Sequence, residues 1–240
     1  MRSFRIALLT AGMLSVVSLQ AQTVDEIINK YFGALGGKDK VASIKTMHVE
    51  YDVDMNGAAA SGASWMVDGK AFKNEMELMG QKFVQVYTDT SGWMINPFGG
   101  ASTPTVMTPD QRQAGLGQID MKGPFYDYAA KGNTVQLLGK EAVDGKTCVK
   151  LSVKTKAGVE FTMWLDTTTW YVMKNVIKTP VNGTVYETTV FTSNYTKTEN
   201  GYLVPWNVEV AMSGITISMT NKKVEVNKDI DMKMFEMPKE

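Results

Sequence analysis

Hydrophobic and polar residues alternate with period two over most of the chain, which is the pattern of strands with one buried face. The clearest run is 46–55, where Met47, Val49, Tyr51 and Val53 alternate with polar residues. Similar runs recur along the sequence. We expect strands near 46–55, 61–68, 70–79, 82–89, 93–96, 134–141, 147–154, 160–166, 170–178, 184–195, 202–213 and 215–226.

Short separators rich in Gly, Asn and Asp join these runs, for example Asp144-Gly145 and Asn200-Gly201. Such dipeptides favour tight hairpin turns with positive φ, so consecutive strands should be antiparallel neighbours. A sheet of about 11 or 12 strands is more than an open twisted sheet usually carries without curling. The pattern therefore predicts a mostly β (α+β) fold, an unclosed and strongly curled antiparallel β-barrel with helices over an apolar cavity.

Helical patterns occur in two places. Thr23 and Glu26 have the spacing of a capping box before an apolar helix face that ends at Gly36-Gly37, and a short helix is expected over 38–43. Residues 97–133 form a Gly- and Pro-rich insertion. Within it we expect a helix from Thr108 to about Gln118 and a second helical piece around 125–128. A long insertion with its own helices inside a meander suggests a lid over the sheet.

The first 21 residues have the layout of a secretory signal: a cationic start with Arg2 and Arg5, an apolar run from Ile6 to Leu19, and a small residue, Ala21, before the expected cleavage site. The apolar run is short for a membrane span, which needs about 20 residues. We therefore expect a soluble periplasmic protein that begins at Gln22, with 22–240 as a single domain.

Composition narrows the function classes. Cys148 is the only cysteine, so neither an internal disulfide nor a lipid anchor on an N-terminal cysteine is predicted. Loss of Arg2 and Arg5 with the leader would reduce the 25 basic residues to 23 against 25 acidic ones, a net charge of about −2. Nucleic-acid binding needs a basic face and is not predicted.

Candidate catalytic residues are few. The only histidine, His48, is in the polar phase of its strand, and we interpret it as a lone surface residue. Cys148 is in phase with Lys150, Ser152 and Lys154, which predicts a partly exposed, inert thiol. The carboxylates of Glu50, Asp52 and Asp54 share a strand face that we expect to be solvated. We therefore predict no enzyme, no metal site and no cofactor.

The apolar content points to a cavity. The chain has 17 methionines, two of them in the leader, and methionine is flexible enough to line surfaces that accept variable apolar partners. Ordinary core filling is the alternative for any single methionine. If the sheet curls with its apolar phase inward, the residues that line the cavity are Met47, Val49, Tyr51, Val53, Met76, Leu78, Phe161, Met163, Leu165, Val208, Val210 and Met212.

Several segments resemble the LolA-like family of outer-membrane lipoprotein-sorting factors. They are the opening 24–38, the hairpin 138–151, the turn that follows Trp164-Leu165-Asp166, and the end, with Asn200-Gly201 through Pro205 and then 235–238. The resemblance spans nearly all of 24–238. It implies an unclosed barrel whose cavity carries lipoprotein acyl chains between the inner and outer membranes, while relatives of the same fold sense lipids or lipoproteins.

Three hypotheses follow. The leading one is a periplasmic carrier or binding protein for a lipoprotein or other acylated lipid, with an inner-membrane donor and an outer-membrane acceptor as partners. The second is a lipid-sensing or scaffold subunit that docks a protein on the concave sheet. The third, a hydrolase, lacks a recognisable pair of nucleophile and base.

Overall fold

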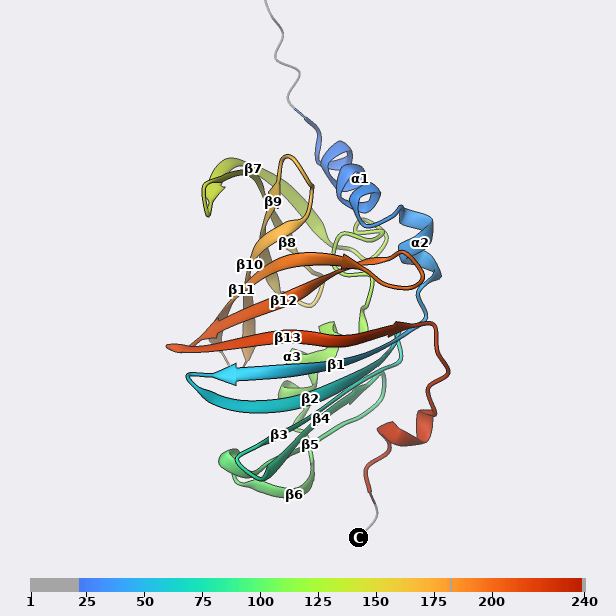
Figure 1. The fold of residues 1–240 in the computed structure, drawn as a ribbon, viewed down its shortest axis with the longest axis vertical. Helices are drawn as coiled ribbons and strands as arrows, with labels where there is room; N and C mark the ends of the chain where they lie inside the picture. Colours follow the sequence, from blue (N-terminus) through green and yellow to red (C-terminus); the bar gives the residue numbers. More distant parts are fainter. Residues whose placement is uncertain (1–21, 182, 239–240) are drawn as a thin grey trace, which may run out of the picture.

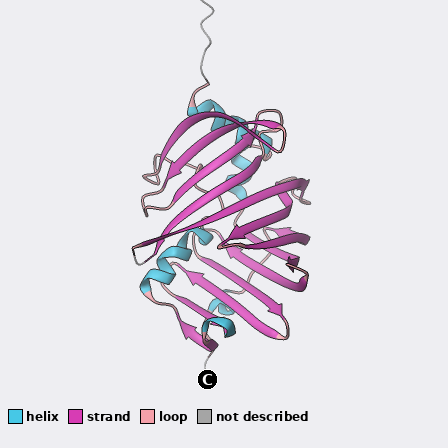
Figure 2. Cartoon of the chain, turned by 90° about the vertical axis from the view of Figure 1, so that its left-hand side faces the viewer, coloured by secondary structure: helices cyan, strands magenta, loops and turns pink. Residues whose placement is uncertain are grey.

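The computed structural model describes residues 22–181 and 183–238. The predicted leader, 1–21, lies outside the described residues. The chain forms one 13-stranded antiparallel sheet that curls around a concave side (Figure 1 and Figure 2). This confirms the predicted mostly β, unclosed and curled fold class, with one strand more than the upper expected number.

The strands are β1 (Thr46–Met55), β2 (Ala58–Val67), β3 (Ala71–Leu78), β4 (Gln81–Thr88), β5 (Gly92–Asn96), β6 (Ala101–Val106), β7 (Thr134–Val143), β8 (Lys146–Lys154), β9 (Glu160–Asp166), β10 (Val172–Val181), β11 (Thr184–Lys197), β12 (Leu203–Met212) and β13 (Ile215–Val226). The helices are α1 (Val24–Ala34), α2 (Lys38–Ser43) and α3 (Pro109–Gly115), with 3₁₀ turns η1 (Pro97–Gly99), η2 (Leu116–Ile119) and η3 (Met232–Phe235).

The sheet consists of two meanders that meet in its middle. β1 to β6 pair in sequence order, β7 to β13 do the same, and β1 pairs with β13. β6 and β7 are therefore the strands at the two opposite edges, although they follow one another along the chain. The connection between them, residues 107–133, has to pass from one edge to the other, and we call it the lid segment.

Helix α1 covers one end of the concave side. Its capping box forms as predicted, with the Thr23 hydroxyl accepting from the Glu26 amide at 3.2 Å. Ile27 and Phe32 are buried against Leu151 and Leu165 of β8 and β9. This packing fixes the helix across the strands that lead into the cavity.

The C-terminal turn η3 covers part of the opposite, convex face. Phe235 is buried with Val84, Val86 and Trp93, and the Trp93 indole nitrogen Nε1 donates to the Phe235 carbonyl at 2.9 Å. β4 therefore has apolar residues on both faces. One face is turned toward the cavity, and the other packs against the C-terminal turn. Strict alternation between a dry and a wet face fails in these strands.

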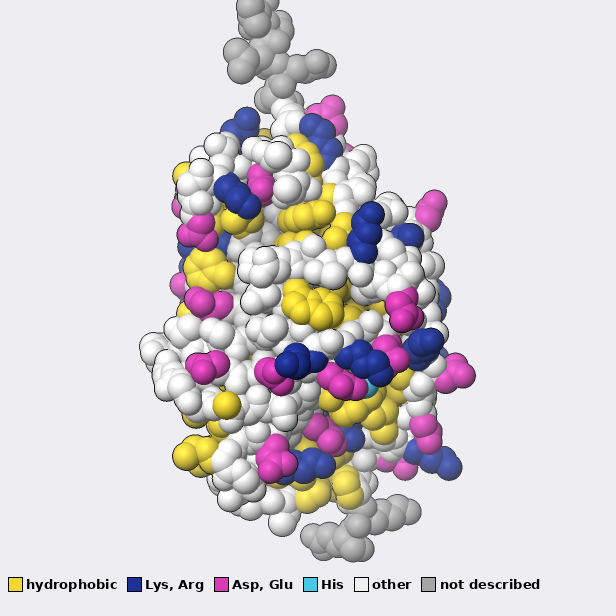
Figure 3. Space-filling model, in the orientation of Figure 1, with side chains coloured by type: hydrophobic (Ala, Val, Ile, Leu, Met, Phe, Trp, Pro, Cys, Tyr) yellow, Lys and Arg dark blue, Asp and Glu magenta, His cyan; other side chains and the backbone are white. Residues whose placement is uncertain are grey.

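The remaining convex surface carries charged side chains, as the alternation of 46–55 predicts, with apolar patches between them (Figure 3). Lys222 pairs with Asp52 at 2.8 Å and Lys223 lies 4.0 Å from Glu50. Figure 3 shows acidic and basic side chains interspersed across the face turned to the viewer. Because both signs are present, Glu50, Asp52 and Asp54 form a solvated face of β1 rather than a cation site.

The insertion predicted at 97–133 is shorter than expected, because its first part is η1 and the edge strand β6. Pro104 lacks an amide donor, so it is tolerated only on an edge strand such as β6. The expected helix from Thr108 forms as α3 and η2, with Thr108 in a second capping box. The helical piece expected at 125–128 is wrong: Asp127 has φ +46° and these residues form turns.

Two residues predicted to lie exposed on the surface are covered by neighbouring side chains, Cys148 fully and His48 in part. Cys148 is fully buried in the convex layer with Val143 and Trp164, because the large indole covers it, and burial raises the pKa of its thiol. The His48 side chain is only 18% exposed. Its ring stacks on Trp65, with the centroids 5.1 Å apart, and its Nδ1 lies 3.1 Å from a Glu225 carboxylate oxygen. Both corrections have one cause, which is that tryptophans occupy the polar phase of neighbouring strands.

Candidate ligand pocket

The cavity at the centre of the concave side has a volume of about 610 Å³, within the range of small-molecule sites, about 300 to 1,000 Å³. Its walls come from α1, the lid segment and strands of both meanders. The lining residues are Tyr31, Leu35, Met47, Val49, Tyr51, Ser64, Phe72, Asn74, Gln85, Gln118, Met121, Met163, Val172, Asn175, Val190, Thr192, Tyr195, Tyr202, Leu203, Val204, Pro205, Met219, Asn221 and Val224.

The lining is uncharged: among these described residues there is no Asp, Glu, Lys, Arg or His. Methionine, aliphatic and aromatic side chains predominate, and the polar members are hydroxyls and amides. Burial raises the pKa of the Tyr31, Tyr195 and Tyr202 phenols, that of Tyr195 to about 12. These phenols therefore stay neutral at physiological pH. The pocket offers apolar contact and neutral hydrogen bonds.

The strand register places all the predicted cavity residues in one phase. Across β9 to β13 of the second meander, Met163 lies opposite Asn175, Asn175 opposite Val190, Val190 opposite Val210, and Val210 opposite Ile217. Each pair of opposite residues points to the same face of a sheet. Residues far apart in sequence are therefore neighbours on the concave face.

Four of the twelve predicted residues line the pocket itself: Met47, Val49, Tyr51 and Met163. The others lie on the same face outside it. Phe161 and Leu165 pack under α1, and Val53 and Met76 form a cluster with Met219 next to the pocket. Leu78 is buried near the end of β3, Val208 and Val210 are half-buried, and Met212 is 44% exposed near the end of β12.

Beyond those four, the pattern missed the rest of the lining: apolar residues such as Val190 and Val224, the contributions of α1 and the lid segment, and the whole polar part. Three polar residues lie side by side on β2, β3 and β4: Ser64, Asn74 and Gln85. Two more, Asn175 and Asn221, line the pocket from the second meander. Hydropathy cannot select polar residues for a cavity, but their phase could have done so. Ser64, Asn74 and Gln85 occupy inward positions where the alternation otherwise calls for apolar side chains.

The lid segment contributes Gln118 and Met121 to the pocket and is anchored at its ends. Arg112 Nη2 donates to the carbonyls of Thr88 and Asp89 in the β4–β5 turn. Gly115 approaches the Tyr87 ring so closely that a Cβ built at position 115 would lie 2.0 Å from Tyr87 Cε1. Arg112 is the only arginine in the sequence after the predicted leader, and it anchors the lid segment without lining the pocket.

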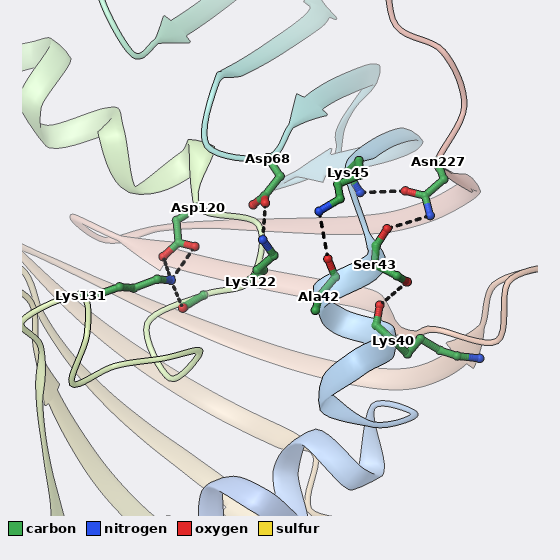
Figure 4. A network of polar contacts seen from close by, with 10 residues as sticks. Lys40, Ala42, Ser43, Lys45, Asp68, Asp120, Lys122, Lys131 and Asn227 are labelled. Atoms are coloured by element: carbon green, nitrogen blue, oxygen red, sulfur yellow. Dashed lines mark hydrogen bonds and ion pairs between the residues drawn. The ribbon is translucent and has the colours of Figure 1, made fainter.

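Ion pairs hold the other end of the lid segment (Figure 4). Lys122 Nζ lies 2.5 Å from an Asp68 carboxylate oxygen in the β2–β3 turn, and this hydrogen bond raises the pKa of Lys122. Lys131 bridges Asp120, at 2.6 Å, and the Gly123 carbonyl, at 2.9 Å, within the segment. The lid is thereby attached to the turns of both hairpins that β2 to β5 form at this end of the sheet.

A separate set of bonds in the same figure ties the start of β1 to the end of β13. The Asn227 amide accepts from the Lys45 backbone at 2.7 Å and donates to the Ser43 carbonyl at 3.1 Å. These bonds lock α2 to the seam where the two meanders meet. The pocket walls on both sides of the seam are consequently fixed relative to each other.

Several solved structures share this architecture. A LolA superfamily protein from Nitrosomonas europaea superposes with a TM-score of 0.57 at 14% identity, over 90% of this chain and 98% of its own. The fold is LolA-like. An outer membrane lipoprotein-sorting protein domain from Vibrio parahaemolyticus gives a TM-score of 0.55 at 12% identity, over 88% of this chain and 94% of its own.

A DUF1329 family protein from Desulfovibrio piger is equally similar, with a TM-score of 0.55 at 12% identity, over 87% of this chain and 97% of its own. No protein-family model matches the sequence, and no curated protein is significantly similar to it. At such identities the LolA-like likeness is one of architecture.

Two further observations bear on the site. Within residues 22–181 and 183–238, no three His, Cys, Asp or Glu side chains are arranged to hold a metal ion. In the same part of the chain, no helix is long and apolar enough to cross a membrane.

Proposed function

We propose that this protein is a periplasmic carrier or binding protein for a lipoprotein or another acylated lipid, which holds acyl chains in its pocket for transfer toward the outer membrane. The observation that carries the proposal is the uncharged, largely apolar pocket of about 610 Å³ beneath the lid segment. Burial contributes about 0.8 kcal/mol per CH₂, so a C16 chain would gain roughly 12 kcal/mol before ordering costs.

Two findings support the location and the ligand class. The sequence of 1–21 has the layout of an export signal, which would deliver the protein to the periplasm. The LolA-like fold is shared with a domain described as an outer membrane lipoprotein-sorting protein. A carrier of this kind would receive its lipid from an inner-membrane donor and release it to an outer-membrane acceptor.

Native mass spectrometry of gently purified protein tests the proposal, because a carrier should arrive with bound lipid. Charge-insertion variants then locate the ligand. Met163→Asp and Val210→Asp place a carboxylate on the concave face, where an unpaired ion is costly. Thr162→Asp and Asn207→Asp place it on the convex face as matched controls. Equal lipid content in all four folded variants would reject the pocket as the site.

The alternative function, a lipid-sensing or scaffold subunit that docks a protein on the concave sheet, has one observation in its favour. Large apolar side chains are exposed at hairpin ends: Val185 by 61%, Tyr186 by 50%, Met212 by 44% and Ile215 by 46%. Protein that purifies without lipid, and binds none when it is offered, would favour this alternative.

Export is tested separately by intact mass. A mature chain starting at Gln22, recovered with the soluble periplasmic fraction, is the expected result. A chain that retains the apolar run from Ile6, or that carries an added acyl mass, would contradict it.

A further inference from the structure

The polar row on β2 to β4 contains a hydrogen-bond arrangement that crosses three strands. Tyr51 on β1 lies opposite Gly62 on β2, and Ser64 on β2 lies opposite Asn74 on β3. The Tyr51 hydroxyl donates to the Asn74 amide oxygen Oδ1. Tyr51 therefore reaches past its immediate neighbour strand to a residue on the next one.

Gly62 makes this reach possible. A Cβ at position 62 would lie 2.6 Å from the Tyr51 hydroxyl oxygen, 2.7 Å from Tyr51 Cζ and 2.8 Å from the Glu75 carbonyl oxygen. Glycine in a strand interior is unfavourable and commonly marks the close approach of another group. Here the approaching group is the hydroxyl end of the Tyr51 ring.

The bond to Tyr51 fixes which end of the Asn74 amide is available. Burial raises the pKa of the Tyr51 phenol, so the hydroxyl stays protonated and acts as the donor. The amide oxygen of Asn74 is engaged, and among the described residues no group accepts from its nitrogen Nδ2. Asn74 lines the pocket, so this N–H₂ group is the donor that it presents there.

The charge of the pocket decides what such a donor can bind. With no cationic side chain among the described lining residues, a carboxylate or phosphate drawn into the pocket would lose its hydration without gaining a counter-ion. A neutral carbonyl oxygen meets no such penalty and gains a hydrogen bond. The surrounding Ser64 and Gln85 side chains are neutral as well.

We infer that Asn74, held by Tyr51 across Gly62, binds a carbonyl oxygen of an ester- or amide-linked acyl group and makes the pocket selective for uncharged lipids over free fatty acids. This inference rests on the proposed lipid-binding function and adds the ligand's linkage chemistry to it. The apolar walls hold the chain, and the polar row holds its uncharged head.

Competition binding tests the inference on the mature full-length chain. Methyl palmitate, palmitamide and palmitate at pH 8 would each displace a bound neutral fluorophore, Nile red. We expect the ester and the amide to bind at least about tenfold more tightly than palmitate, a difference of about 1.4 kcal/mol. Palmitate that binds as tightly as its methyl ester to the wild-type protein would overturn the inference without requiring any variant.

Variants assign the effect to Asn74. Asn74→Asp keeps an acceptor for the Tyr51 hydroxyl but replaces the donor with a charged acceptor, so affinity for the ester should fall about tenfold or more. Tyr51→Phe should keep the packing over Gly62 and weaken ester binding by a smaller factor. Asn207→Asp is the matched control, since Asn207 also accepts a side-chain hydrogen bond, from Asn194 at 3.1 Å, but lies in the convex row with Asp52.

The outcomes separate the two proposals. Wild-type protein that binds none of the three palmitoyl compounds would reject the lipid-binding function itself. Tight binding of all three, unchanged by Asn74→Asp, would leave that function standing and reject the role of Asn74.

Discussion

The contact between Gly115 of α3 and Tyr87 of β4 gives the sharpest test of how the lid segment sits. In Gly115→Ala the added Cβ would lie 2.0 Å from Tyr87 Cε1 and 2.2 Å from Cζ. Ordinary carbon contacts are about 3.5 to 4.0 Å, so the lid or the ring has to move by about 1.5 Å. Tyr87 is 9% exposed and has little room to do so.

The size of the effect follows from two opposing terms. Overpacking of this kind costs about 1 to 3 kcal/mol, while replacing glycine by alanine in a helix gains at most about 1 kcal/mol. Since the overlap with the ring is large, we expect a net loss of about 2 kcal/mol in the free energy of unfolding. For a domain of this length that lowers Tm by about 4 to 8 °C.

Gly117→Ala is the matched control, because a Cβ at Gly117 meets nothing within 4 Å. It should leave Tm unchanged or raise it. Tyr87→Leu combined with Gly115→Ala should recover part of the loss, since the shorter side chain vacates the space of the ring. Thermal unfolding of wild type, Gly115→Ala, Tyr87→Leu and the double variant completes a double-mutant cycle. A Gly115→Ala variant as stable as Gly117→Ala would refute this account of the lid.

Three more predictions follow from the polar and sulfur contacts. Cys148 is fully buried, so iodoacetamide should leave it unmodified in native protein and label it fully in denaturant; rapid native labelling, followed by mass spectrometry, would contradict its placement. Arg112→Gln should lower the free energy of unfolding by about 1 to 3 kcal/mol in denaturant titrations, because the charged donor to two turn carbonyls is lost, and an unchanged midpoint would argue against that anchoring. Burial opposes ionisation of Glu75, but its bonds to Lys73 and Lys82 outweigh this effect and hold the pKa of Glu75 below its usual value. Glu75 therefore stabilises the fold above the ordinary carboxyl pKa of about 4.3, and this stabilisation is lost as the pH falls through the pKa of Glu75 in the folded protein. Glu75→Gln should flatten that acid limb of the stability curve, and an identical curve for both proteins would exclude Glu75 as its source.

The period-two pattern determined much of the architecture by itself. Strict alternation in 46–55 defines β1 and its inward residues Met47, Val49, Tyr51 and Val53, because a half-buried strand must separate apolar from polar side chains. The hairpin dipeptides, which occur at turns such as Asp144-Gly145 with φ of +47° and +74°, set the order of neighbours. The capping residues Thr23 and Thr108 likewise predicted where two helices begin.

The tertiary structure decided what local patterns cannot express. The pairing of β1 with β13 joins residues more than 160 positions apart, and only this seam turns two meanders into one curled sheet. It also sends β6 and β7 to opposite edges, so the segment between them lies over the pocket. The solvent exposure of an outward residue such as Cys148 depends on Trp164 of the neighbouring strand. The hydropathy of β8 alone gives no information about this neighbour.

The lining of the pocket also has a part that the sequence predicted and a part that only the tertiary structure determined. Phase selected four of its apolar members, Met47, Val49, Tyr51 and Met163, because the hydrophobic effect places the apolar side of a strand on the concave face. Its polar members depend on a meeting of side chains from three strands, in which Tyr51 crosses Gly62 to reach Asn74. Such contacts are set by register and by the close packing of one side chain over another. The sequence therefore determined which strand residues face the concave side, and only the folded sheet decided the hydrogen bonds among them.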